Sequence, residues 1–110
     1  MRFTRAEKIA WAAGFFEGEG SITESNGQLI TRITNTDESM LQRFRDAVDA
    51  GRTYGPYAPY RRDGFNRKPV FVWHAAEEAA LDVLALLGPW LSARRLERAY
   101  ELTGLRFHGI

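Results

Sequence analysis

The chain contains no cysteine and only two histidines, His74 and His108. Without cysteine it has no disulfide bonds and no thiolate zinc sites, although this absence is neutral about the cellular compartment. Two histidines are too few for a histidine-rich transition-metal site within one chain. Any bound metal is therefore expected to be a hard cation held by carboxylates.

The sequence also lacks long hydrophobic runs and a strong excess of charge. No apolar run reaches the roughly 18 to 20 residues that a helix needs to span a bilayer, and the start of the chain does not resemble a signal peptide. We therefore expect no membrane partner. The net charge is +1 and the pI about 8.1, below the value of roughly 9 that is typical of nucleic-acid-binding domains.

The positive and negative charges are distributed unevenly along the chain, and this distribution is more informative about binding than the net charge. Acidic residues gather in the predicted helices, whereas six positive charges fall in the segment predicted to form strands: Arg32, Arg52, Arg61, Arg62, Arg67 and Lys68. A basic sheet backed by helices of mixed charge would suit a surface that binds DNA. The alternative is ordinary surface charge that is segregated by chance.

The chain has 110 residues, of which 45% are hydrophobic, enough for one compact domain over residues 1–110. Capping signals, hydrophobic periodicity and the Asn26-Gly27 turn predict its elements. The first half of the chain is expected to form a helix from Thr4 to about Glu17, a hairpin over 21–34 and a helix ending at Gly51. The second half is expected to form a hairpin with a turn at 62–64 and a strand at 70–73, followed by helices over 75–87 and 91–102. The predicted fold is α+β, of the order αββαββα(α), with a curved antiparallel sheet backed by helices.

The first predicted helix carries a stripe with little side-chain bulk. Ala10, Ala13, Gly14 and Glu17 follow helical spacing along one face, and small residues allow a second helix to approach closely. We interpret this stripe as a dimer interface made by two copies of the helix. The alternative is one buried helix that packs tightly against its own sheet.

The segment Ala12-Ala13-Gly14-Phe15-Phe16-Glu17-Gly18-Glu19-Gly20 resembles the motif of the LAGLIDADG homing endonucleases. It keeps Ala-Gly, two large apolar residues, acid, small residue, acid and Gly, but has Ala12 in place of Leu and Glu in both acidic positions. A carboxylate at a helix C-terminus is disfavoured by the macrodipole and needs a cation. The resemblance implies that Glu19 is the metal-binding acid, that the Gly18 carbonyl joins it, and that the cofactor is Mg²⁺ or Mn²⁺.

Two further segments are similar to the same family. Asn35 follows a predicted strand, in a position where a polar amide commonly helps to position the attacking water; it could equally be part of a turn. Gly88-Pro89-Trp90-Leu91-Ser92-Ala93-Arg94 resembles a pattern that ends in a basic residue near the metals. The resemblance implies that Arg94 stabilises charge on phosphorus, although arginine is not a proton donor at neutral pH.

The predicted sheet would read the DNA sequence. Because side chains alternate between faces, the residues expected to contact DNA are Ser21, Thr23, Gln28, Ile30, Arg32, Tyr54, Tyr57, Tyr60, Arg61, Arg62, Asn66, Arg67 and Lys68.

The resemblance implies a homodimer that cuts both strands of a long palindromic or near-palindromic target, with one motif acid in each subunit. Such enzymes leave short 3′ overhangs and serve intron or intein mobility. The expected location is the cytoplasm of a bacterial, phage or archaeal host, with an organelle as the alternative. Two other functions stay open on the same fold, a DNA-binding regulator without catalysis and an RNA maturase; an accidental motif in a structural module is a third reading.

Overall fold

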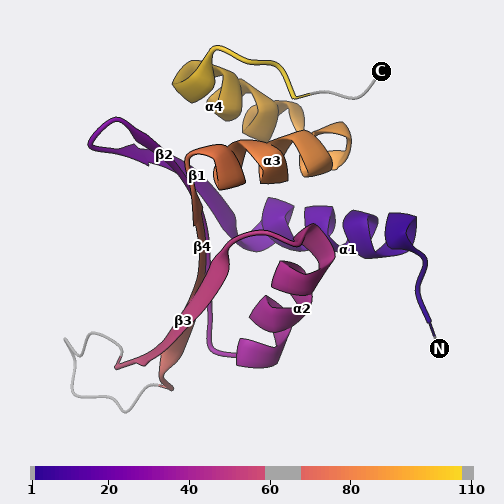
Figure 1. The fold of residues 1–110 in the computed structure, drawn as a ribbon, viewed down its shortest axis with the longest axis vertical. Coiled ribbons are helices and arrows are strands. Elements are labelled where there is room, and N and C mark those ends of the chain that lie inside the picture. Colours follow the sequence, from indigo (N-terminus) through magenta and orange to yellow (C-terminus); the bar gives the residue numbers. More distant parts are fainter. Residues whose placement is uncertain (1, 59–67, 108–110) are drawn as a thin grey trace.

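The computed structural model describes residues 2–58 and 68–107. Within them, the chain forms α-helices, β-strands and one short 3-10 helix (Figure 1). In chain order the elements are α1 (Arg5–Glu19), β1 (Gly20–Ser25), β2 (Gln28–Asn35), α2 (Glu38–Val48), β3 (Arg52–Tyr57), β4 (Val70–Ala76), α3 (Glu78–Leu87), η1 (Gly88–Trp90) and α4 (Ala93–Thr103).

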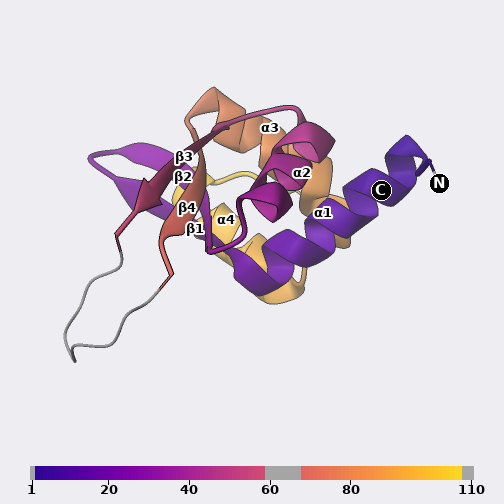
Figure 2. The same ribbon diagram turned by 90° about the horizontal axis from the view of Figure 1, so that it is seen from below.

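The strands make one antiparallel sheet in the order β1-β2-β4-β3, so that β2 and β4 lie in its centre. The described helices lie on one side of this sheet, and none of them covers its other face (Figures 1 and 2). The hairpin of β1 and β2 and the paired ends of β3 and β4 both bend away from the helices. The sheet therefore presents a curved, open surface.

Local sequence signals explain how the first elements begin and end. Thr4 and Glu7 form a capping box at the start of α1: the Glu7 amide donates to the Thr4 hydroxyl, and the Thr4 amide donates to the Glu7 carboxylate. Asn26 and Gly27 have φ angles of 53° and 79°, as the tight turn of a two-residue hairpin requires. Both features were predicted from the sequence and are confirmed.

The core lies between the covered face of the sheet and the helices. Phe16 of α1, Ile33 of β2, Phe44 of α2 and Trp73 of β4 are fully buried. The rings of Phe44 and Trp73 meet edge to face with centroids 4.7 Å apart, and the Trp73 indole N–H donates to the Ala50 carbonyl over 2.9 Å. Burial of these aromatic side chains supplies much of the hydrophobic stabilisation that holds the layers together.

The predicted α+β fold and its element order are confirmed, but several boundaries are wrong. Helix α2 ends at Val48 rather than at Gly51, and the strand predicted over 70–73 continues to Ala76. The helix expected from Ala75 begins at Glu78, because Ala75 and Ala76 continue β4. Ala75 is buried against the helices as a strand residue, and the Glu77 amide donates to the Leu29 carbonyl of β2. The last helix begins at Ala93 rather than Leu91 because η1 comes before it.

The turn predicted at 62–64 lies outside the described residues. In the part of the chain that the structure describes, no helix is both long and apolar enough to cross a membrane.

Gly51 joins α2 to β3 at a place where a side chain does not fit. Its φ is +79°, and a Cβ there would lie 2.6 Å from the Trp73 indole nitrogen. Gly27 has the same φ but open space around it. We expect Gly51→Ala to lower the free energy of unfolding in urea by more than about 2 kcal/mol, against roughly 1 kcal/mol for Gly27→Ala. Equal losses for the two variants would contradict this packing.

Candidate functional site

Helix α1 ends at the edge of the sheet with two acidic residues, Glu17 and Glu19. Glu19 is the last residue of the helix, and Gly20 begins the edge strand β1. The side chain of Glu19 is exposed, as is Gly18, where a Cβ would meet nothing within 4 Å. The predicted metal-binding pair, Glu19 and Gly18, therefore lies at the surface where α1 joins β1.

Glu17 has partners within its own chain. The backbone amide of Ser92 donates to one Glu17 carboxylate oxygen over 2.8 Å, and the Ser92 hydroxyl donates to the other over 2.9 Å. Since Ser92 is the N-cap of α4, the Glu17 carboxylate lies at the positive end of a helix dipole, which stabilises its charge. These contacts fasten the C-terminal end of α1 to the start of α4.

Two arginines of α4 complete this contact, which we call the Glu17 clamp (Glu17, Ser92, Arg94 and Arg95). The Arg95 guanidinium donates to the Glu17 carbonyl over 3.0 Å, and a second of its nitrogens lies 3.8 Å from the carboxylate. An Arg94 nitrogen lies 3.7 Å from the same carboxylate, although 73% of its side chain is exposed. Burial alone would raise the pKa of Glu17, but the hydrogen bonds from Ser92 and the charges of Arg95 and Arg94 together lower it.

Within the clamp, the predicted residue Arg94 lies beside Glu17 at the acidic end of α1. Its role near a metal held by Glu19 stays a prediction. Ser92 and Arg95 were not predicted. The N-cap signal of Ser92 before a helical segment was available in the sequence, but its pairing with Glu17, 75 residues away along the chain, was not.

Asn35 ends β2 at the same end of the sheet as Glu19. The strand register pairs Gly20 with Ile33, so that Asn35 lies two residues beyond the partner of Gly20. Its side-chain oxygen accepts a hydrogen bond from the Asp37 amide over 2.8 Å. The turn that was the alternative interpretation of Asn35 is therefore present, and a role in positioning water stays a prediction.

The described residues do not contain a complete metal site. No three acidic or histidine side chains come together in residues 2–58 and 68–107. The oxygen donors at the end of α1 are of the class that Mg²⁺ prefers, but one chain contributes only Glu19 and the Gly18 carbonyl to it. Such a set fits a hard divalent cation only if further ligands come from another molecule, such as water, DNA or a second copy of the chain.

The predicted dimer stripe is divided between core and surface. Ala13 is only 1% exposed because it packs in the core of its own chain, so it offers almost no surface for the predicted interface. Ala10 is half-buried, and Glu17 is engaged in the clamp. Gly14 is exposed, and a Cβ at Gly14 or Gly18 would meet nothing within 4 Å. The smooth surface available to a second helix is therefore formed by Gly14 and Gly18, with Ala10 at its border.

The uncovered face of the sheet carries several of the residues predicted to contact DNA. Ser21 is half-buried, whereas Thr23, Gln28, Arg32, Tyr54, Tyr57 and Lys68 are exposed. Ile30 is only 8% exposed, so it offers little surface for the predicted contact. The predicted residues Tyr60, Arg61, Arg62, Asn66 and Arg67 lie outside the described residues.

This face is hollowed between the central strands and β3. The cavity has a volume of about 410 Å³ and is lined by Arg32, Thr34, Tyr54, Tyr57, Val72 and His74. Thr34, Val72 and His74 had no predicted role. The sequence prediction ended the fourth strand at Trp73, which left His74 out; its alternation with Val70 and Val72 along the observed strand places it on the open face.

His74 lies between two arginines in the sheet. Its register partners are Arg32 on β2 and Arg52 on β3. Partial burial lowers the pKa of His74, and the positive charge of Arg32 lowers it further. Both surroundings favour the neutral form of the imidazole.

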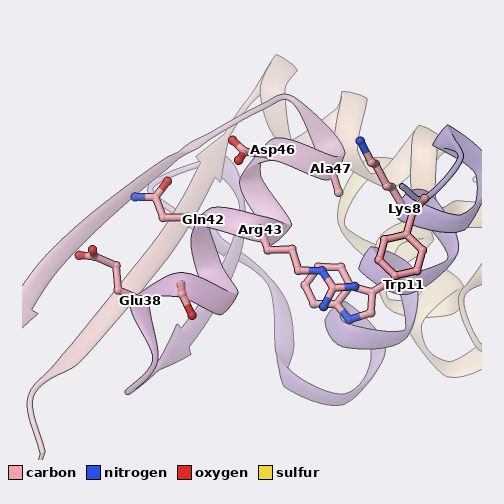
Figure 3. A pocket seen from close by; sticks show the side chains of 9 residues that line it. Lys8, Trp11, Glu38, Gln42, Arg43, Asp46 and Ala47 are labelled. Carbon is pink, nitrogen blue, oxygen red and sulfur yellow. The ribbon is translucent and has the colours of Figure 1, made fainter. Parts of the chain in front are cut away.

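A larger cavity lies among the helices. Its volume is about 580 Å³, and residues of α1 and α2 supply most of its lining. Figure 3 shows Arg43 extended over Trp11, with its guanidinium carbon 3.9 Å from the ring centroid. A cation stacked on an aromatic ring in this way stabilises the contact between α1 and α2, on the side of the sheet away from the open face.

The Glu17 clamp generates a prediction about stability. We expect Ser92→Ala to lower the free energy of unfolding by about 1 to 2 kcal/mol, because α4 loses its cap and Glu17 loses a donor. Ser39→Ala, which removes a hydroxyl at the start of α2 without contacting Glu17, is the control. A double-mutant cycle of Ser92→Ala with Glu17→Gln should show coupling of about 1 kcal/mol; additive losses would contradict the clamp.

The same contact predicts a pH dependence. Because the pKa of Glu17 is lowered in the folded chain, its carboxylate stabilises the fold above the ordinary glutamate pKa, and this contribution is lost as pH falls through the lowered value. The difference in unfolding free energy between the wild type and Glu17→Gln should therefore be largest near neutral pH and shrink in acid. A difference that is constant with pH would contradict the charged state of Glu17.

Comparison with known proteins identifies the fold. No protein-family model matches the chain, and no curated protein is found to be similar in sequence. Among solved structures, the homing endonuclease I-CvuI in complex with its target in the presence of Ca is similar over 92% of this chain and 67% of its own, with a TM-score of 0.62 and 19% identity. The same enzyme with the I-CreI target in the presence of Mg gives a TM-score of 0.60 and 18% identity over the same shares.

The archaeal intron-encoded homing endonuclease I-Vdi141I, complexed with DNA, is similar over 92% of this chain and 85% of its own, with a TM-score of 0.61 and 16% identity. These likenesses agree with the α+β architecture of the chain. The fold of this chain is that of the LAGLIDADG homing endonucleases.

Proposed function

We propose that the chain is a metal-dependent DNA endonuclease that acts as a homodimer and breaks both strands of a palindromic or near-palindromic duplex. The observation that carries this proposal is the position of Glu19. It is an exposed acid at the end of α1, at the border of an uncovered sheet face, in the fold of homing endonucleases.

The open face supports DNA as the substrate. The similar structures of I-CvuI and I-Vdi141I are complexes with DNA. In this chain, one face of the sheet is curved and is not covered by any described helix (Figures 1 and 2), and it presents cationic and hydroxyl side chains of the kinds that contact phosphates and base edges. Duplex DNA is therefore the ligand that best fits its chemistry.

The end of α1 supports hydrolysis of the DNA backbone. The Glu19 carboxylate and the Gly18 carbonyl would hold Mg²⁺ or Mn²⁺, which, when bound, activates water and stabilises charge on the phosphate. The exposed Arg94 guanidinium supplies a positive charge near the same place but no proton at neutral pH. Asn35, at the end of β2, would orient the attacking water through its side-chain amide.

Each chain offers one such acid, which is why we propose a dimer. Two copies related by a twofold axis would bring two Glu19 carboxylates together, one for each strand of a palindromic target. The open surface at Gly14 and Gly18 allows two α1 helices to approach closely without a clash of side chains. The same approach would place both acids near the axis.

The catalytic proposal is tested by cleavage of a randomised duplex library with Mg²⁺ or Mn²⁺. We expect the wild type to make double-strand breaks at selected sequences and Glu19→Gln to lose at least about 100-fold of this activity while still binding DNA, because an amide is a poor ligand for the metal. Glu24→Gln, which alters an exposed acid of β1 away from the end of α1, should cleave like the wild type.

Three results would contradict the proposal. Binding of duplex DNA without cleavage by the wild type would favour a DNA-binding regulator. Binding of structured RNA without cleavage of DNA would favour an RNA maturase. Equal cleavage by the wild type and Glu19→Gln would remove Glu19 from the catalytic site.

A further inference from the structure

The centre of the open face holds a polar row that crosses the sheet from strand to strand. The register places Ser21 of β1 beside Arg32 of β2, Arg32 beside His74 of β4, and His74 beside Arg52 of β3. Arg32 and His74 also line the same cavity, of about 410 Å³. They are thus neighbours on the two central strands, where a duplex seated on the sheet would come closest.

Among residues 2–58 and 68–107, no carboxylate pairs with the Arg32 guanidinium, and Arg32 lines the cavity. The Ser21 hydroxyl donates a hydrogen bond to the backbone carbonyl of Arg32, and this bond does not engage the guanidinium. The described lining of the cavity contains an arginine, an imidazole and the hydroxyls of Thr34, Tyr54 and Tyr57, but neither aspartate nor glutamate. A surface with these donors suits a ligand edge that is rich in hydrogen-bond acceptors.

His74 is the neighbour of Arg32 on the other central strand of the open face. The charged groups that face it from adjacent strands are Arg32 on β2 and Arg52 on β3, with Tyr54 of β3 edge-on at 6.4 Å between ring centroids. Burial, together with the charge of Arg32, lowers the pKa of His74. A neutral imidazole offers one donor and one acceptor and adds no charge that would attract phosphate from any sequence.

Guanine presents two acceptors, O6 and N7, in the major groove, and a guanidinium bonds both at once. A phosphate attracts the same side chain, but phosphates are expected to flank a sheet that lies in the groove, whereas Arg32 is on one of the two central strands. We infer that Arg32, on a central strand of the open face, is a specificity-determining residue that reads a guanine at one position of each half-site. This inference rests on the proposed binding of duplex DNA.

The inference is tested by selecting bound sequences from a randomised duplex library in a metal-free buffer at neutral pH. The wild type should enrich guanine at one position in each half-site. Arg32→Gln should replace it by adenine, the base that glutamine pairs with, and weaken binding to the guanine site by roughly tenfold to a hundredfold. Arg32→Lys, which keeps the charge but not the two-pronged geometry, should lose most of the preference.

Two further variants sharpen the result. Arg5→Gln removes the same charge from the exposed start of α1, far from the sheet (Figure 1), and should select the same sequences as the wild type. His74→Lys places a second cation beside Arg32 and should bind duplexes of all sequences more tightly while discriminating less.

If Arg32→Gln selects the same sequences as the wild type and merely binds them all more weakly, Arg32 contacts phosphate and the inference is wrong, although the proposed function survives. The inference would also be wrong if the wild type selects particular sequences but none of them has a guanine whose enrichment depends on Arg32. The proposed function would again survive. If the wild type binds no duplex at all, the proposed function fails as well.

Discussion

The arrangement of the whole site depends on one contact between distant parts of the chain, the bond of the Glu17 carboxylate to the start of α4. The two hydrogen bonds from Ser92 are 2.8 and 2.9 Å long, and they satisfy an acid that would otherwise be unfavourable at the end of a helix. They also fix the last turn of α1. Because Glu19 belongs to that turn and β1 follows it directly, the clamp sets the position of both.

The clamp also separates the roles of the two motif acids. Glu17 is held by Ser92, Arg94 and Arg95, so its charge is balanced within the chain. Glu19, two residues later, is exposed at the surface. Helix α4 is further joined to the edge strand by Arg98, which donates to the Ile22 carbonyl over 3.2 Å. One helix thus supports the junction from which Glu19 projects and carries a positive charge, Arg94, next to it.

Much of the fold could be predicted from the sequence, because local patterns determine it. The capping box at Thr4, the turn at Asn26-Gly27 and the spacing of apolar residues in α2 each act over a few neighbouring residues, and all are present in the structure. The position of Glu17 and Glu19 at the end of the first helix was likewise predicted from neighbouring residues, and α1 ends at Glu19. The mistaken start of α3 has a local cause too: alanine favours helices, but pairing with β2 holds Ala75 and Ala76 in a strand.

The parts of the site that were missed depend on contacts between distant residues. Ser92 and Arg95 gain their importance from Glu17, more than 70 residues earlier, and no periodicity indicates such a pair. Ala13 fits a smooth stripe by spacing, but packing against the chain's own core buries it. His74 belongs to the open face because β4 continues past Trp73, where the predicted strand ended. Tertiary packing, not propensity, decided each of these positions.

The central claim, that two chains each supply one acid for one strand, is tested most directly with mixed dimers. Wild-type chains and Glu19→Gln chains carrying different affinity tags can be mixed, and the heterodimers purified and given a selected duplex with Mg²⁺. We predict that these heterodimers nick one strand and leave the other intact, whereas wild-type dimers cut both. Cleavage of both strands by the heterodimer, or nicking by the dimer of Glu19→Gln chains, would contradict it.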